Sequence, residues 1–148
     1  MFFLTLFFLF LISDAIAGDS LPDVRLFSVD RLGNIYIIRN DELIRYNESH
    51  QVTARFSRKD LGAPTSIDTR NPLRILVFYR DFGTVRILDN QLSEQSTANL
   101  RTLNILEPAF IAGSADQGLW VYDQSTAQLI KLDRTLDRKR RVGKECLR

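Results

Sequence analysis

Three stretches of this chain repeat one pattern of apolar runs and polar turns. Each stretch begins with a short apolar run, at residues 35–38, 75–79 and 119–122. Each ends on an apolar residue followed by Asn or Asp, and these closing pairs are 46–47, 88–89 and 132–133, which lie 42 and 44 positions apart. Short runs rich in β-branched and aromatic residues predict strands rather than buried helices. A period of about 40–45 residues with strands in each unit is typical of β-propeller blades.

The run at residues 75–79, Ile-Leu-Val-Phe-Tyr, has no polar residue in alternate positions. A strand with one wet face would alternate, so we expect both faces of this strand to be covered. The runs at 35–38 and 119–122 predict the same two-faced burial. A β-sandwich also has short strands and frequent turns, but the regular recurrence favours a propeller, whose blades pack face to face. The predicted fold is therefore all-β, with about three antiparallel blades of an incomplete propeller.

Gly, Asn, Asp and Pro divide the three units, at approximately 24–57, 65–90 and 108–133, into strands and turns. The first unit predicts four strands, at 24–30, 35–39, 43–47 and 52–56. The second and third predict three strands each, at 66–69, 75–80 and 85–89, and at 109–113, 119–123 and 129–133.

Two turns carry a recognisable signature. The segments 30–37 (DRLGNIYI) and 116–121 (DQGLWV) resemble the Asp-x-x-Gly-Asn-Ile/Leu-Tyr/Trp-Val/Ile signature of secreted bacterial propellers of the NHL, SMP-30-like and two-component-regulator types. The stretch 66–82 also resembles blades of an uncharacterised group of exported propeller-like proteins from Bacteroidota. The resemblance covers approximately residues 21–133 and implies a propeller fold. The second unit departs from the signature, because residues 71–74 (NPLR) stand where Gly-Asn would be expected.

The first dozen residues are apolar. As a helix they would span roughly 18 Å, too short for a hydrocarbon core of about 30 Å. Ala15 and Ala17 fit the small-x-small pattern of signal peptidase sites, so we predict a signal peptide over 1–17, cut between Ala17 and Gly18. The alternatives are a short membrane anchor or a core strand. Cleavage implies export to the periplasm or cell surface, with no membrane span in the mature chain.

The last fifteen residues, 134–148, have a different composition. They hold seven basic residues against two acidic ones, whereas residues 18–133 are nearly neutral. A nucleic-acid patch conflicts with export, and the lone Cys146 cannot pair within the chain. We expect this basic tail to be disordered or not native to the fold, as a broken reading frame would produce. Three blades do not close a propeller, so the chain is either part of a longer propeller or closes by self-association.

The candidate chemistry is sparse. His50 is the single histidine and is expected in a solvated turn, and neither a nucleophile motif nor a metal-ligand spacing is present in the sequence. We therefore predict no enzymatic activity, no cofactor and no metal site. The predicted binding residues are Arg80, Asp81 and Phe82, which leave a buried strand and enter a turn. The alternative is that Arg80 pairs with Asp81 while Phe82 fills the blade.

Trp120 is predicted to lie in the core between blades. The leading functional hypothesis is an exported, non-enzymatic binding or scaffold module of the cell envelope, whose partner is a protein or carbohydrate and not a nucleic acid. The alternative is a fragment of a propeller-fold enzyme of the lactonase, glycosidase or quinoprotein type. A repeat fold by itself does not choose between them.

Overall fold

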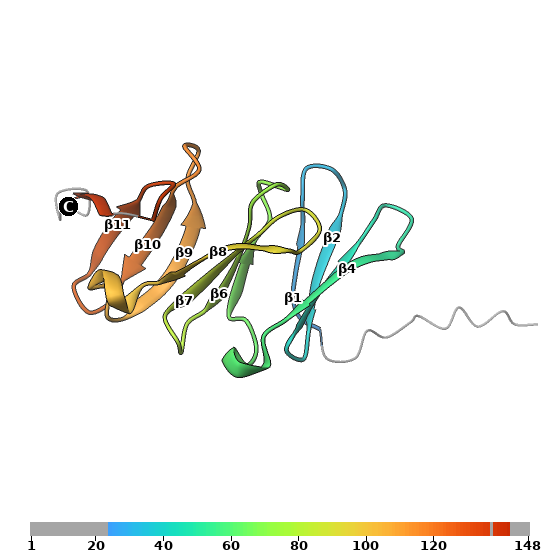
Figure 1. The fold of residues 1–148 in the computed structure, drawn as a ribbon, viewed down its shortest axis with the longest axis horizontal. Coiled ribbons are helices and arrows are strands. Elements are labelled where there is room, and N and C mark those ends of the chain that lie inside the picture. The colour runs from blue at the N-terminus through green and yellow to red at the C-terminus, as the bar shows by residue number, and fades with distance from the viewer. Residues whose placement is uncertain (1–23, 137, 143–148) are drawn as a thin grey trace, which may run out of the picture.

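Three four-stranded antiparallel sheets stand in a row in the computed structural model, which describes residues 24–136 and 138–142 (Figure 1). The first sheet contains β1 (Val24–Val29), β2 (Ile35–Arg39), β3 (Glu42–Tyr46) and β4 (Val52–Ser57). The second contains β5 (Ser66–Asp68), β6 (Ile75–Tyr79), β7 (Thr84–Leu88) and β8 (Glu94–Asn99). The third contains β9 (Pro108–Gly113), β10 (Leu119–Asp123), β11 (Gln128–Leu132) and β12 (Arg138–Val142). Short 3₁₀ helices, Lys59–Leu61 and Arg101–Leu103, connect the sheets.

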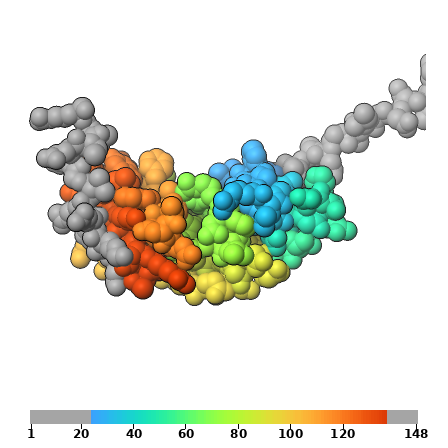
Figure 2. Space-filling model, turned by 90° about the horizontal axis from the view of Figure 1, so that it is seen from above, coloured from blue at the N-terminus to red at the C-terminus, as the bar shows by residue number. Residues whose placement is uncertain are grey.

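The sheets form an arc, and the first strand of each sheet lies on its concave side (Figure 2). Each sheet is a simple meander in which neighbours in sequence are neighbours in the sheet. The first strands of adjacent sheets are in contact, and the hydroxyls of Ser28 on β1 and Thr69 just after β5 are 2.7 Å apart. The architecture is that of a partial β-propeller, which confirms the predicted fold class. The described part of the chain has no helix long and apolar enough to cross a membrane.

Strand β6 is buried on both faces, as its unbroken apolar sequence predicts. Its even-numbered residues, Leu76 and Phe78, pack toward the third sheet with Leu119 and Val121 in a cluster that we call the second core. Its odd-numbered residues pack toward the first sheet in the first core, whose buried members are Tyr36, Ile38, Leu43, Ile75, Val77, Tyr79, Leu88 and Leu92. The middle sheet therefore supplies side chains to two separate cores.

The end sheets do not share this two-faced burial, so the prediction for 35–38 and 119–122 is wrong. Along β2, Tyr36 and Ile38 are buried but Ile35 and Ile37 are only half-buried. Along β10 the same alternation occurs, with Val121 buried and Trp120 half-buried. Among the described residues, each end sheet has a neighbouring sheet on one side only, and the apolar residues on its other face are only partly buried.

The closing pairs of the three units occupy equivalent turns. The backbone N–H of His50, Leu92 and Leu136 donates to the carbonyl of Asn47, Asp89 and Asp133, three residues earlier, at 2.9, 3.1 and 3.0 Å. Each of these donors also has a positive φ, of 57°, 58° and 68°. The repeat read from the sequence is thus a repeat of structure. His50 is exposed in its turn, as expected.

The outer strands β8 and β12 were not expected from the sequence. Strand β8 is polar and mostly exposed, and it pairs with β7 along the backbone, while Arg86 of β7 also contacts Glu94 and Thr97 of β8. Strand β12 lies in the basic tail and pairs antiparallel with β11, Lys131 opposite Arg140. Part of the tail that was expected to be disordered or not native to the fold, Arg138–Val142, therefore forms an edge strand, which needs a free backbone ladder rather than an apolar face. Residues 1–23, which include Ala17, Gly18 and the predicted signal peptide, and residues 143–148, which include Cys146, lie outside the described residues.

Candidate functional site

The signature at residues 30–36 builds the turn between β1 and β2. The buried carboxylate of Asp30 accepts hydrogen bonds from the backbone N–H of Leu32 at 2.8 Å and of Asn34 at 3.0 Å. It also accepts from the Asn34 side-chain amide at 2.9 Å and from the Tyr36 hydroxyl at 3.0 Å. The carboxylate therefore holds both the turn and the start of β2, and it fixes the neighbouring Arg31 on the surface.

The electrostatics of this turn follow from its hydrogen bonds. Burial raises the pKa of Asp30, but the hydrogen bonds from Asn34, Leu32 and Tyr36 outweigh it and leave the pKa below its ordinary value. Burial, followed by the hydrogen bond to Asp30, raises the pKa of Tyr36 to about 12. At neutral pH, Tyr36 is therefore protonated and donates its hydrogen bond to an ionised Asp30 carboxylate.

The corresponding turn of the third sheet corrects one alignment. The sequence reading placed Asp116 at the position of Asp30, but Ser114 makes the equivalent backbone contacts. Ser114 N donates to Gly118 O at 3.1 Å, as Asp30 N does to Asn34 O at 3.0 Å. Asp116 instead contacts Lys131 at 2.7 Å, and that hydrogen bond is the main cause of its lowered pKa. The third unit shares the turn geometry but not the buried carboxylate.

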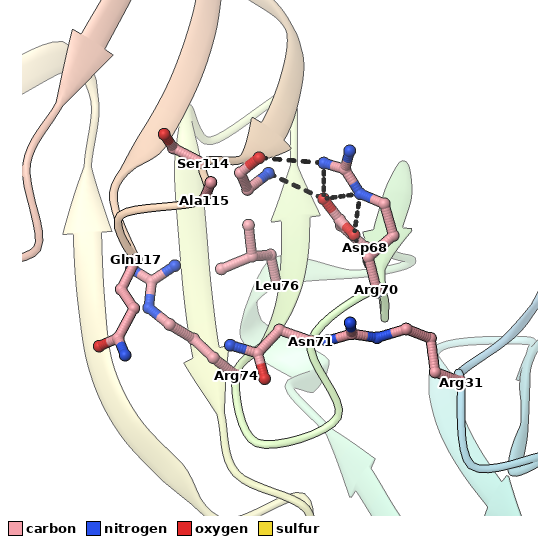
Figure 3. A pocket seen from close by; sticks show the side chains of 10 residues that line it. Arg31, Asp68, Arg70, Asn71, Arg74, Leu76, Ser114, Ala115 and Gln117 are labelled. Carbon is pink, nitrogen blue, oxygen red and sulfur yellow. Dashed lines mark hydrogen bonds and ion pairs between the residues drawn. The ribbon is translucent and has the colours of Figure 1, made fainter.

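These turns surround a cleft of about 500 Å³ at one end of the strands (Figure 3). Figure 3 shows the Arg31 side chain extending from the first sheet toward Asn71, while Arg74 reaches toward Gln117 of the third sheet. The polar side chains that line the cleft are Arg31, Asp68, Arg70, Asn71, Arg74, Ser114 and Gln117. All three sheets therefore contribute to this hollow, which we call the arginine cleft.

One wall of the arginine cleft is an ion pair that also joins two sheets. Arg70 Nη2 lies 2.6 Å from Asp68 Oδ2, and Arg70 Nε donates to Asp68 Oδ1 at 3.0 Å. The N–H of Gly113, at the end of β9, donates to Asp68 Oδ2 at 2.8 Å, and Arg70 Nη2 donates to Gly113 O at 3.1 Å. Burial raises the pKa of Asp68, yet the bonds from Arg70 and Gly113 leave it lowered. The single carboxylate of the cleft is thus already engaged.

The other arginines give the cleft a surplus of positive charge. Arg74 is half-buried, and its guanidinium donates to the Gly118 carbonyl at 3.4 Å, a neutral partner. Burial, followed by repulsion from Arg134, lowers the pKa of Arg74, but an arginine remains charged at neutral pH. The exposed Arg31 lines the same hollow. An anion placed here would meet guanidinium groups whose charge the cleft does not neutralise.

The predicted binding residues lie at the opposite ends of the strands. Arg80 and Asp81 line a smaller hollow of about 360 Å³ with Arg101 and Glu107. Arg80 donates to the Ala109 carbonyl at 2.8 Å. Its guanidinium also lies 5.5 Å from the centre of the Phe110 ring.

Phe82 is not among the lining residues of this hollow, and it is 46% exposed. It therefore does not fill the blade, and Arg80 is directed to Ala109 rather than across the turn to Asp81. The structure brings Arg80 and Asp81 to one hollow. Their role in binding stays a prediction.

The arginine cleft itself was missed by the sequence reading, and a faint signal for it was present. Arg31, Arg70 and Arg74 all fall in turns that join the first and second predicted strands of a unit. In a repeat fold, equivalent turns gather at the same end of the molecule. In the described ranges, 24–136 and 138–142, no group of three His, Cys, Asp or Glu residues could hold a metal ion.

Comparison with known proteins supports the fold. No protein-family model matches the chain, and no curated protein matches it. A streptogramin B lyase structure is similar, with a TM-score of 0.62 and 12% identity over 81% of this chain and 41% of that one. A protein of unknown function from Bacteroides caccae has a TM-score of 0.51 and 15% identity over 76% of this chain and 43% of its own. AztD from Citrobacter koseri has a TM-score of 0.57 and 15% identity over 85% of this chain and 37% of its own.

The chain thus spans about 40% of the length of the structures it matches. At such low identity these likenesses show the fold and not a family. The structural similarity is to part of a β-propeller.

Proposed function

We propose that this chain is an exported, non-enzymatic binding module of the cell envelope whose arginine cleft binds a carboxylate-bearing partner. The observation that carries the proposal is the convergence of Arg31, Arg70 and Arg74 on one hollow that contains a single, already paired carboxylate. The planar guanidinium group binds carboxylates through two parallel hydrogen bonds, so this arrangement suits a carboxylate better than a neutral ligand.

The partner is an acidic segment of an envelope protein or a carbohydrate with uronate groups. The cleft is partly open to solvent and lies between turns of all three sheets, and this supports recognition of part of a larger molecule. The alternative, a fragment of a propeller-fold enzyme, has weaker support. The similarity to a lyase structure supports the fold and says nothing of activity. The described residues that line the cleft include no histidine and no cysteine.

Carboxylate binding can be tested with a hexaglutamate peptide and an oligogalacturonate as probes. We expect the double variant Arg31→Gln/Arg74→Gln to bind the preferred probe at least tenfold more weakly, since a charge-assisted hydrogen bond contributes about 1.5–3 kcal/mol and 1.4 kcal/mol is a factor of ten. Titration calorimetry at low and moderate salt measures the affinity. Arg70 is left unchanged because its loss would release Asp68.

The matched control is Arg101→Gln, which removes an exposed arginine from the smaller hollow at the opposite end. The proposal requires Arg101→Gln to bind the probe as the wild type does. If Arg101→Gln weakens binding and the double variant does not, the site is the hollow of Arg80 and Asp81. Absence of binding to both probes contradicts carboxylate recognition.

Export is tested by the mass of the protein. We expect chain recovered from the cell envelope to begin at Gly18, because Ala15 and Ala17 fit the peptidase. Intact-mass spectrometry measures this directly, and Ala17→Arg should block the cut. A recovered mass that retains residues 1–17 would contradict the signal peptide.

A further inference from the structure

The two ends of the row of sheets carry apolar side chains that the described residues leave partly exposed. On the first sheet, Phe27 stands opposite Ile37 and Val29 stands opposite Ile35 in the β1–β2 ladder. Phe27 is 74% exposed and Val29 is 54% exposed. These four side chains form what we call the first end face.

On the third sheet, Tyr122 stands opposite Phe110 on one side and Leu129 on the other, with Trp120 two residues away on β10. The rings of Phe110 and Tyr122 are 6.4 Å apart, and Phe110 is 64% exposed. These four side chains form the second end face.

The packing inside the molecule follows one rule of direction. In β2, β6 and β10, even-numbered residues point toward the next sheet and odd-numbered residues toward the preceding one. In the first core, Tyr36 of β2 packs with Ile75 and Val77 of β6. In the second core, Phe78 of β6 packs with Leu119 and Val121 of β10. Each interface thus joins the even face of one sheet to the odd face of the next sheet.

The end faces are the two unmatched halves of the same interface. Trp120 and Tyr122 of the second end face are even-numbered and aromatic, as are Tyr36 and Phe78. Ile35 and Ile37 of the first end face are odd-numbered and aliphatic, as are Ile75 and Val77. The rule that orders the sheets within the chain therefore extends from the third sheet of one molecule to the first sheet of another.

We propose that two copies of this chain associate head to tail, each second end face packing on the partner's first end face. The contact continues the established interface between sheets, and one charged pair on each face is already neutralised, Glu42 with Arg55 at 2.6 Å and Asp116 with Lys131 at 2.7 Å. A heterologous contact closes into a ring when its rotation allows. Two copies of the three described sheets give six, which is within the range of about four to eight for propellers, whereas three copies exceed it.

The test uses the chain expressed from its full sequence, with Phe27→Glu on the first end face and Phe110→Glu on the second. Both side chains are mostly exposed, so each variant should fold, which its thermal melt verifies. We expect the wild type to sediment as a dimer. The dissociation constant of each variant should be at least tenfold higher, because each of the two contacts in the dimer then contains one altered end face. Leu73→Glu, at a residue 70% exposed in a turn of the second sheet, is the control and should remain dimeric.

Mixing the two variants separates head-to-tail association from other arrangements. In a mixed pair, the unaltered second end face of Phe27→Glu meets the unaltered first end face of Phe110→Glu, so one contact is intact. The mixture should therefore form a one-to-one pair that is tighter than the pair either variant forms by itself. A wild type that stays monomeric at high concentration, an open series of larger assemblies, or a dimer that one of the two variants preserves would overturn the proposal.

Discussion

Replacing Phe78 by Asp is expected to prevent the chain from folding. Phe78 is fully buried on the face of β6 that meets the third sheet, and its cross-strand neighbour is the buried Val85. The surrounding second core is apolar, so the new carboxylate would have no partner. An unpaired buried charge costs several kcal/mol, comparable with the whole stability of a domain, about 5–15 kcal/mol. Circular dichroism and a thermal melt measure the loss.

Phe82→Asp is the matched control, because Phe82 lies in the turn after β6 and is half exposed. It should melt close to the wild type. Val77→Asp should also prevent folding, because Val77 is equally buried in the apolar first core and Arg86, opposite it on β7, already pairs with Glu94. A cooperative, wild-type-like melt of Phe78→Asp would contradict burial of both faces of β6.

Replacing Asp30 by Ala is expected to lower the free energy of unfolding by about 3 kcal/mol or more. The substitution leaves the buried Tyr36 hydroxyl and Asn34 amide without their acceptor, and it removes the support of the β1–β2 turn. Tyr36→Phe removes a single hydrogen bond and should cost about 1 kcal/mol. Urea unfolding at neutral pH measures both. Equal losses in the two variants would show that Asp30 acts through Tyr36 alone.

Asp30 also contributes a pH dependence with a definite sign. Its pKa is lower in the folded chain than the ordinary 3.8, so its contribution is present above that value and is lost as the pH falls through the folded pKa. Asp30→Asn removes the pH-dependent contribution of this carboxylate to stability. The urea concentration at the unfolding midpoint should therefore fall less for Asp30→Asn than for the wild type between pH 5 and about pH 3. Parallel curves for the two proteins would contradict the lowered pKa.

The sequence predicts strands well where burial dictates the side chains. The unbroken run of apolar residues in β6 predicts that both of its faces are covered. The turns at Asn47, Asp89 and Asp133 mark the repeat. The outer strands β8 and β12 carry polar residues because they lie at sheet edges, so no apolar periodicity reveals them. Backbone pairing is open to any sequence, so it leaves no periodic pattern in the side chains.

The arginine cleft was harder to predict because its residues come from different sheets. Arg31 and Arg74 are 43 positions apart, and only the stacking of the sheets brings their turns to one hollow. The signature, in contrast, aligned Asp116 with Asp30, although Ser114 occupies the position equivalent to Asp30 in the structure. A motif aligned by letters can shift by two residues when a turn keeps its backbone hydrogen bonds and changes its side chains.

The alternating packing of β6 has a consequence for how the chain unfolds. The first and second cores have no sheet in common except the middle one, and consecutive residues of β6, such as Val77 and Phe78, belong to different cores. In a row of stacked units, stability is carried by nearest-neighbour contacts, so either end sheet can detach while the other stays docked. The loss of β6, however, would dissolve both cores in one step. This five-residue strand is therefore the element that makes three separate sheets a single cooperative unit, and its amide protons should be the last to exchange with solvent.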